Sequence, residues 1–193
     1  EEQLLSTHTP DGARWRYGYD TRGRLEDVTS PLGRTRSTRW HPLWALPLCE
    51  VDESGGQWRY ERNATGDIIS MTDALDATTT FTVNRYGEVI TETDALGNRR
   101  EFRYDLRGRL IGRTDCSGQR AWWRYDSRGW LSEASDEDGN INAWQWSPAG
   151  RLQRTEPPSH DETHYRYDSA GRLCGEETCL LVTALTRNAR GQV

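Results

Sequence analysis

The feature that most constrains this chain is a seven-residue pattern, Tyr-Asp-x-x-Gly-Arg-Leu, which recurs along its length. One full copy runs from Tyr104 to Leu110. Its glycine returns every 20 to 22 residues, most often every 21, at Gly23, Gly66, Gly87, Gly108, Gly129, Gly150, Gly171 and Gly191, and Trp44 fills the one gap. A fixed period of this length is typical of a repeat protein in which each copy folds as one supersecondary unit.

The pattern predicts a tight turn between two antiparallel strands. Aspartate accepts hydrogen bonds from the backbone that follows it, and glycine adopts positive φ without strain. A type I turn closed by a glycine bulge would place Asp105 opposite Arg109 and Tyr104 opposite Leu110. The residues assigned to these turns are Asp20, Gly23, Gly66, Gly87, Asp105, Gly108, Asp126, Gly129, Gly150, Asp168 and Gly171.

Alternation with a period of two places rings and branched side chains on one face of the predicted strands. Phe102 has the same parity as Tyr104, and Leu110 faces that ring across the turn. The columns expected to form this face are Tyr17, Tyr19, Phe102, Tyr104, Leu110, Trp123, Tyr125, Leu131, Trp144, Trp146, Leu152, Tyr165, Tyr167 and Leu173. The aliphatic column also takes in Leu25, Leu46, Ile68, Val89 and Val193.

A second turn signal lies midway between the first ones, as in Asp94-Ala95-Leu96-Gly97. The chain is therefore expected to be all-β, a continuous antiparallel hairpin meander of about eight 21-residue repeats with no helix longer than a turn. Residues 1–8 are interpreted as an incomplete leading segment, and residues 9–193 as the repeat array, truncated within a repeat. If both turns had odd loops, Val89 would face Arg103, so we expect an even second loop that keeps Val89 beside Phe102.

The opposite face is predicted to be charged and solvated. Its arginines are Arg16, Arg39, Arg59, Arg103, Arg124 and Arg166, with Asp27, Glu92, Glu101 and Glu133 within cross-strand reach. Exposed pairs of this kind contribute only about 0 to 1 kcal/mol each. Because 30 acidic residues outnumber 25 basic ones, the chain is not expected to bind nucleic acid.

Cysteine usage and hydropathy exclude two further classes. Cys49, Cys116, Cys174 and Cys179 show no paired spacing, which favours free thiols over a disulfide framework or a metal site. No apolar run approaches the length of a membrane span, so no membrane-spanning helix is expected.

The repeated pattern, with Thr93-Asp94-Ala95-Leu96-Gly97 between two copies, resembles the RHS or YD-repeat family from about Thr9 to Val193. The resemblance implies a long β-sheet ribbon that spirals into a hollow shell. In bacterial polymorphic toxins, including type VI secretion effectors and insecticidal toxin complexes, that shell encloses a C-terminal toxin before delivery. In teneurins the related barrel serves cell-surface adhesion.

On this resemblance the chain is expected to be a non-catalytic shell segment of a protein that is made in the bacterial cytoplasm and then secreted or delivered. Its expected partners are the remaining RHS repeats of the parent, the enclosed toxin, and secretion-spike or chaperone proteins. Self-cleaving members of the family end in an aspartyl-protease-like segment with Asp-Pro-x-Gly signatures, and no Asp-Pro occurs here. Trp40–Leu46, Arg62–Gly66 and Val83–Gly87 depart from the motif, and a bulky Trp44 resists the positive φ that glycine would adopt.

Two segments contain residue types that can bind metals, but both are expected to be turns. His160-Asp161-Glu162-Thr163-His164 lacks the glutamate directly after the first histidine and the helix that a zincin needs. Asp136-Glu137-Asp138-Gly139-Asn140 has its glycine at the fourth position, where a repeat turn needs it, and not at the sixth as in a calcium loop. No metal, cofactor or catalytic residue is therefore expected.

The alternative function is a carbohydrate-binding or adhesive module. Exposed tryptophans such as Trp122 or Trp130 would then stack on sugars. Trp122 has the parity of the arginine face and should be accessible. An enzyme is disfavoured because no nucleophile, base or metal set stands apart from the repeat.

Overall fold

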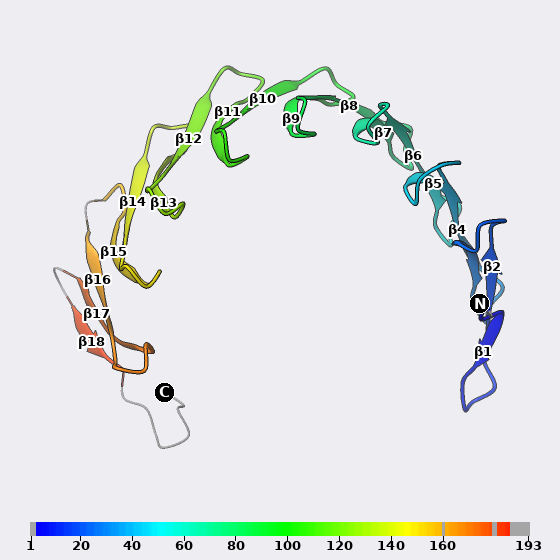
Figure 1. Cartoon of the computed structure of the whole chain (residues 1–193), viewed down its shortest axis with the longest axis horizontal. Coiled ribbons are helices and arrows are strands. Elements are labelled where there is room, and N and C mark those ends of the chain that lie inside the picture. The colour runs from blue at the N-terminus through cyan, green and yellow to red at the C-terminus, as the bar shows by residue number, and fades with distance from the viewer. Residues whose placement is uncertain (1–2, 160, 179–180, 186–193) are drawn as a thin grey trace. The chain divides into compact units, whose positions relative to one another are not determined.

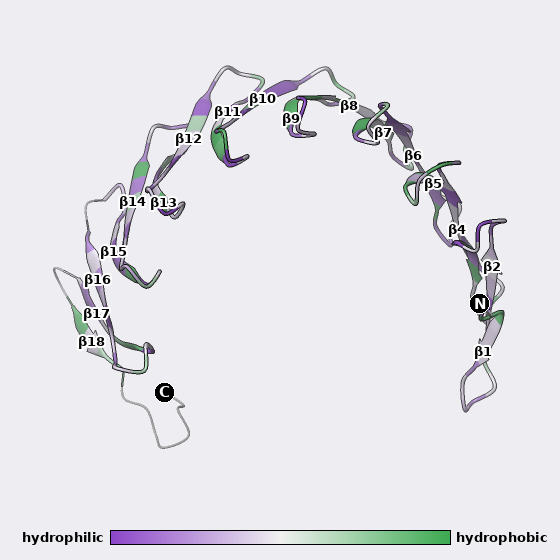
Figure 2. Cartoon of the chain, in the orientation of Figure 1, coloured by the Kyte–Doolittle hydropathy of each residue, from purple (hydrophilic) through white to green (hydrophobic). Residues whose placement is uncertain are grey.

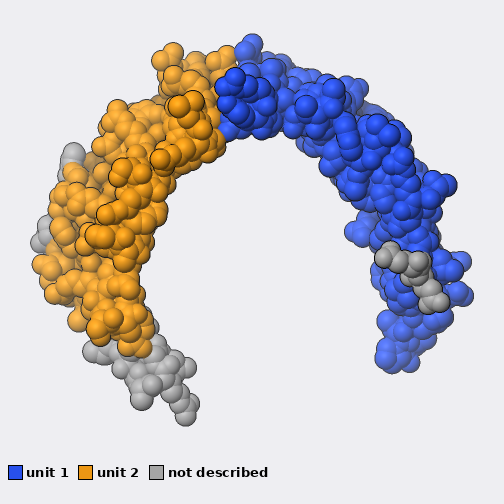
Figure 3. Space-filling model, viewed as in Figure 1, with its two compact units in different colours: residues 1–100 blue, residues 101–193 orange. Residues whose placement is uncertain are grey.

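The computed structural model describes residues 3–159, 161–178 and 181–185, which form strands joined by turns (Figure 1). The chain divides into two units, residues 1–100 and 101–193 (Figure 3). No helix in the described ranges is long and apolar enough to cross a membrane.

The first unit holds β1 (Ser6–His8), β2 (Arg14–Tyr19), β3 (Leu25–Thr29), β4 (Thr35–Trp40), β5 (Pro47–Val51), β6 (Gln57–Arg62), β7 (Ile68–Thr72), β8 (Thr78–Val83) and β9 (Val89–Thr93). The boundary between the units falls within β10 (Arg99–Tyr104). The second unit continues with β11 (Leu110–Thr114), β12 (Arg120–Tyr125), β13 (Leu131–Ser135), β14 (Ile141–Trp146), β15 (Leu152–Glu156), β16 (Thr163–Tyr167), β17 (Leu173–Thr178) and β18 (Val182–Ala184). Within each unit the strands pair antiparallel in chain order, which confirms the predicted all-β hairpin meander.

The first turn of each repeat is followed by a bulge. Tyr104 pairs with Leu110, as the motif predicts, whereas Arg103 pairs with Gly112, so Ile111 is one residue in excess. The same register shift follows the equivalent turns, for example between Arg124 and Tyr125. A bulge reverses the parity of the strand beyond it.

The prediction of an even second loop is wrong. Asp115 N donates to Gln119 O at 2.9 Å, and Gly118 N donates to Asp115 O at 3.1 Å, so the second turn also has a three-residue loop. Two odd loops would move the rings to the other face in alternate hairpins, but the bulge compensates for this change. As a result, Phe102 pairs with Arg113, and Arg113 pairs with Ala121 of the next ring-bearing strand.

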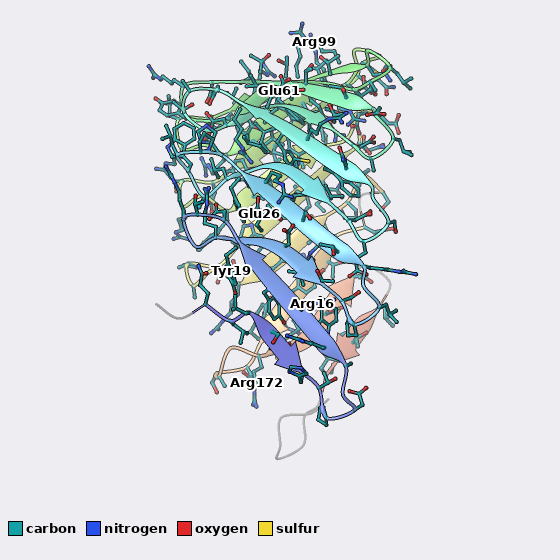
Figure 4. All side chains as sticks on the ribbon, turned by 90° about the vertical axis from the view of Figure 1, so that its right-hand side faces the viewer. Arg16, Tyr19, Glu26, Glu61, Arg99 and Arg172 are labelled. Carbon is teal, nitrogen blue, oxygen red and sulfur yellow. The ribbon has the colours of Figure 1, made fainter. Side chains whose placement is uncertain are left out.

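The two faces of the sheet differ as the alternation predicts. The ring face carries the aromatic columns, and in the second unit these are Phe102, Tyr104, Trp123, Tyr125, Trp144, Trp146, Tyr165 and Tyr167. The arginine face carries Arg103, Arg124 and Arg166 in that unit, and Arg16, Arg39 and Arg59 in the first. Figure 4 draws the side chains as sticks, with Arg16 of the arginine face and Tyr19 of the ring face labelled on β2.

The sheet has almost no interior of its own. Ala121, 4% exposed, is the only buried hydrophobic residue in the described part of the chain, and no large side chain there is fully buried. Figure 2 shows short hydrophobic stretches alternating with hydrophilic ones along the strands. The rings are half-buried against one another and against neighbouring side chains.

Glu92 is a further correction to the predicted faces. It pairs with Phe81 and therefore lies on the ring face, where its Oε1 is 3.4 Å from Nη1 of Arg100. Asp27 and Glu133 do lie on the arginine face, 3.4 Å from Arg39 Nη1 and 2.7 Å from Arg124 Nη1, respectively. The parity error at Glu92 has the same cause as the wrong second loop, namely the bulge.

The turn that contains Trp44 is longer by one residue. His41 N donates to Leu46 O at 2.8 Å, which leaves four residues in the loop, and Trp40 pairs with Pro47. Pro47 therefore occupies the aliphatic column in place of Leu46. Trp44 needs no positive φ, since Asp76 is the only non-glycine residue with positive φ in the described ranges. The ring of Trp44 instead stacks on His41, with centroids 4.4 Å apart.

Candidate functional site

The repeat motif builds a self-contained turn. Asp105 Oδ1 accepts hydrogen bonds from Arg107 N at 2.8 Å and from Arg109 N at 3.1 Å. Gly108 has a φ of 77°, in the region that L side chains rarely adopt. The glycines at the equivalent positions, Gly23, Gly66, Gly87, Gly129, Gly150 and Gly171, also have positive φ.

The arginine of the motif closes the turn from the other side. Arg109 Nε donates to Asp105 Oδ2 at 2.8 Å, and Arg109 Nη2 lies 2.6 Å from the same oxygen. The Arg109 side chain, followed by the backbone N–H groups of Arg109 and Arg107, lowers the pKa of Asp105 below its ordinary value of 3.8. The same pair forms at Asp20 with Arg24 (2.7 Å) and at Asp168 with Arg172 (2.8 Å).

In several repeats, the ring that precedes the turn binds to the repeat before it. Tyr125 OH donates to Leu110 O at 2.9 Å, and the Arg109 guanidinium lies 4.4 Å from the centroid of the Tyr125 ring. The same contact to the carbonyl 15 residues earlier is made by Tyr19, Trp40, Trp146 and Tyr167, at 2.6 to 2.9 Å. Consecutive repeats are thus joined by side chains as well as by the strand ladder.

The turn glycine also makes room for the previous repeat. A Cβ on Gly129 would lie 3.2 Å from Nη1 of Arg109, and one on Gly150 would lie 3.1 Å from the Trp130 ring. Both contacts span 20 residues, from the position after one motif glycine to the next motif glycine. By contrast, a Cβ on Gly118 in a second turn would have nothing within 4 Å.

Four repeats keep this turn with different side chains, the last of them with Ser147, whose Oγ accepts from Arg151 N at 3.1 Å. Asn63 Oδ1 accepts from the backbone N–H groups of Thr65 and Asp67, and its amide donates to Asp67 Oδ2 at 3.0 Å. Asn84 and Glu88 repeat the arrangement at 2.7 Å. In these two turns the first residue donates and the residue four positions later accepts, which is the reverse of Asp105 and Arg109. In the third, Asp126 accepts from the backbone N–H of Trp130, whose side chain stands where arginine would be.

Neither tryptophan singled out for sugar stacking is an open platform. Trp122 pairs with Ser135 on the arginine face, as predicted, but it is half-buried with the Arg124 guanidinium 4.5 Å from its ring centroid. Trp130 is half-buried between Gly150, Trp146 and Arg128.

The acidic side chains of the two segments with metal-ligand residue types make contacts within their own turns or with a neighbouring histidine. Asp136 Oδ1 accepts from Asp138 N and Asn140 N, and its Oδ2 accepts from the Asn140 amide. His164 Nε2 lies 3.0 Å from Glu162 Oε2, while His160 lies outside the described residues. In the described ranges, no group of three His, Cys, Asp or Glu side chains could hold a metal ion.

The thiols are described at three of the four cysteines. Cys49, Cys116 and Cys174 are free, as expected from their spacing. Cys179, Gly191 and Val193 lie outside the described residues.

The contacts between repeats were not predicted from the sequence. Their signal was present in the spacing, because Arg109 and Gly129 are 20 residues apart and Leu110 and Tyr125 are 15 apart. Neither interval equals the 21-residue period, so comparing equivalent positions of successive repeats does not reveal these contacts.

Comparison with known proteins agrees with this geometry. The family profile described as RHS Repeat matches residues 3–35, 84–115, 104–141 and 146–179. No curated protein matches the chain.

Solved structures share the fold. The crystal structure of TcdB2-TccC3-TEV covers 91% of this chain at 22% identity with a TM-score of 0.72, and that of TcdB2-TccC3 without its hypervariable C-terminal region gives the same values. The Tc holotoxin pore of Photorhabdus luminescens covers 91% at 18% identity with a TM-score of 0.56. This chain spans only 11% of the length of the first two chains and 12% of the third.

Proposed function

Because the chain belongs to the RHS repeat family, we propose that it forms part of the wall of a β-sheet shell that encloses a C-terminal toxin before delivery. The parent protein would be secreted or delivered by a bacterium, with its remaining repeats and the enclosed toxin as partners. In this role the turn residues and the aromatic columns are structural, and none is catalytic.

The observation that carries the proposal is the side-chain link from one repeat to the one before, which five rings make. Tyr125 holds the Leu110 carbonyl while Arg109 packs against the Tyr125 ring. Such links would hold neighbouring repeats together in a continuous sheet, although the strands bury little apolar surface. The fold shared with TcdB2-TccC3, a protein with a hypervariable C-terminal region, supports a container in which the wall is constant and the content varies.

Protease protection in the intact parent protein tests the proposal. The domain that follows the repeats should resist proteinase K in the native parent and become sensitive in an Arg109→Ala/Gly129→Val variant, which opens the link between two repeats. Gly118→Val is the matched control, because its Cβ meets no neighbouring repeat. Equal sensitivity of that domain in the native parent and when it is expressed alone would refute enclosure.

A further inference from the structure

One first turn of the array is closed by a histidine. The first residue of each such turn uses its side chain to accept backbone N–H groups from the residues that follow, as Asp105 does. The residues at this position are Asp20, His41, Asn63, Asn84, Asp105, Asp126, Ser147 and Asp168. Of these side chains, imidazole is the type that changes its charge between about pH 5 and 8.

The His41 ring takes the place of the carboxylate. Its Nδ1 accepts hydrogen bonds from Leu43 N at 3.1 Å and from Trp44 N at 3.3 Å. The Trp44 ring stacks on the imidazole, with 4.4 Å between the centroids and 12° between the planes. A ring nitrogen that accepts N–H groups must keep its lone pair, so this turn requires the neutral imidazole with its proton on Nε2.

The loop that His41 closes contacts the repeats on both sides. Arg24 of the preceding repeat donates from Nη1 to His41 O at 2.9 Å and to Trp44 O at 2.6 Å. Toward the following repeat, a Cβ on Gly66 would lie 3.1 Å from Cδ1 of Leu46 and 3.7 Å from the Trp44 ring. A change in this loop therefore reaches both of its neighbours.

The charged groups that face the loop are mostly cationic. Arg22 and Arg24 both donate to its carbonyl oxygens, and Asp20 neutralises Arg24 at 2.7 Å. In the following repeat, Arg62 donates at 2.9 Å to the carbonyl of the glycine that faces the loop. Among the residues that the structure describes, no carboxylate is bonded to the His41 ring. A positive charge on this ring would have no acidic partner.

We propose that His41 makes this turn a pH-sensitive switch. In the imidazolium both ring nitrogens are donors, so Nδ1 would present a hydrogen to the N–H groups of Leu43 and Trp44 instead of accepting from them. Stacking on Trp44 favours the cation, but it does not supply the lost acceptor. The neutral ring therefore holds the turn closed above the titration range of histidine, and this contribution is lost as pH falls through that range.

Opening in mild acid should be confined to this turn. The carboxylate of Asp105 keeps its contacts until the pH falls below about 3.8. The switch rests on the hydrogen bonds of one turn and not on the enclosure of a toxin, so either proposal can fail alone.

Amide hydrogen exchange followed by NMR on the whole chain tests the switch at about pH 7.5 and about pH 5. After correction for the intrinsic pH dependence of exchange, the amides of Leu43 and Trp44 should lose at least about tenfold of their protection in mild acid. The amides of Arg107 and Arg109, which are bonded to Asp105, should keep theirs. Equal changes at the two turns would overturn the proposal.

Three variants assign the effect to the ring. His41→Asn supplies an amide oxygen, which accepts in the same way at Asn63 and Asn84 and does not titrate, so it should keep the turn protected at both pH values. His41→Ala should leave the turn unprotected at both. His164→Gln is the matched control, because it removes a histidine that lies against Glu162 and closes no turn, and the full acid response should remain.

Two outcomes with these variants contradict the switch. If His41→Asn loses protection in mild acid as the unaltered chain does, the titrating group is not His41. If His41→Ala keeps the amides of Leu43 and Trp44 protected at about pH 7.5, the ring nitrogen does not hold the turn closed.

Discussion

At the residue scale, the fold depends on a carboxylate and a guanidinium that close one turn and then reach the next repeat. Asp105 accepts two backbone hydrogen bonds and a charged pair from Arg109, whose guanidinium also packs on Tyr125. Arg109 Nη1 is buried without a hydrogen-bond partner among the described residues, so its placement depends on packing. Glycine at the following motif leaves the space for it.

Substitution of the two classes of turn glycine should separate backbone strain from packing. Gly129 and Gly118 have φ of 99° and 88°. Gly118→Ala should cost about 1 kcal/mol through φ alone. Gly129→Ala should cost more, because Arg109 must move as well. Urea denaturation measures both losses, and Arg109→Ala should remove the excess in a double variant. Equal losses for the two glycines would contradict the packing role.

Acid should lower the stability of the fold by protonating the aspartates of the turns. Because the Arg109 contact lowers the folded pKa of Asp105, the carboxylate stabilises the fold fully above its unfolded value of 3.8, and this contribution is lost as pH falls through the lowered folded value. The thermal midpoint should therefore fall below about pH 3.8, and less steeply in Asp105→Asn. Asp138→Asn removes a carboxylate that makes no such contact and should leave the slope unchanged. A midpoint that stays constant down to pH 2.5 would contradict this role.

At the scale of the strand and turn, the sequence predicted the parts but not how they compensate for one another. The Asp-x-x-Gly turns, the Tyr104 to Leu110 pairing and the single ring face all follow from residue type and parity. The bulge at Ile111 could not be predicted in this way, because the residue type at position 111 does not signal a bulge. It is evident only from the pairing of Arg103 with Gly112 in the structure.

The ring-to-carbonyl bond between repeats should contribute measurably. Tyr125→Phe keeps the ring against Arg109 but removes the 2.9 Å bond to Leu110 O, and it should cost about 1 kcal/mol. Tyr165→Phe is the control, because the hydroxyl of Tyr165 is 3.4 Å from Thr155 Oγ1, a weak contact. Urea denaturation of the two variants gives the comparison. A loss at Tyr165 as large as that at Tyr125 would mean that the bond does not join the repeats.

At the scale of the whole molecule, each unit is held together by nearest neighbours. The strand pairs in contact within each unit are consecutive in the chain, for example β12 with β13 and β13 with β14. Stability in such an array is a sum of repeat terms and interface terms. Among the described residues, no single buried core keeps either unit folded.

Damage should therefore remain local. Arg109→Ala should speed amide hydrogen exchange in β11, β12 and β13, next to the broken contact, and leave β3 to β6 at their original rates. Exchange measured by mass spectrometry on peptides from both regions makes the comparison. Uniform acceleration across both regions would show a longer-range cooperative core.

The bulge after each first turn has an evolutionary consequence. Since it restores parity once per repeat, every repeat starts and finishes with its rings toward the same side. Gene duplication or deletion in steps of one repeat then joins without inverting either surface. Selection can lengthen or shorten such an array by recombination while its two faces keep their chemistry.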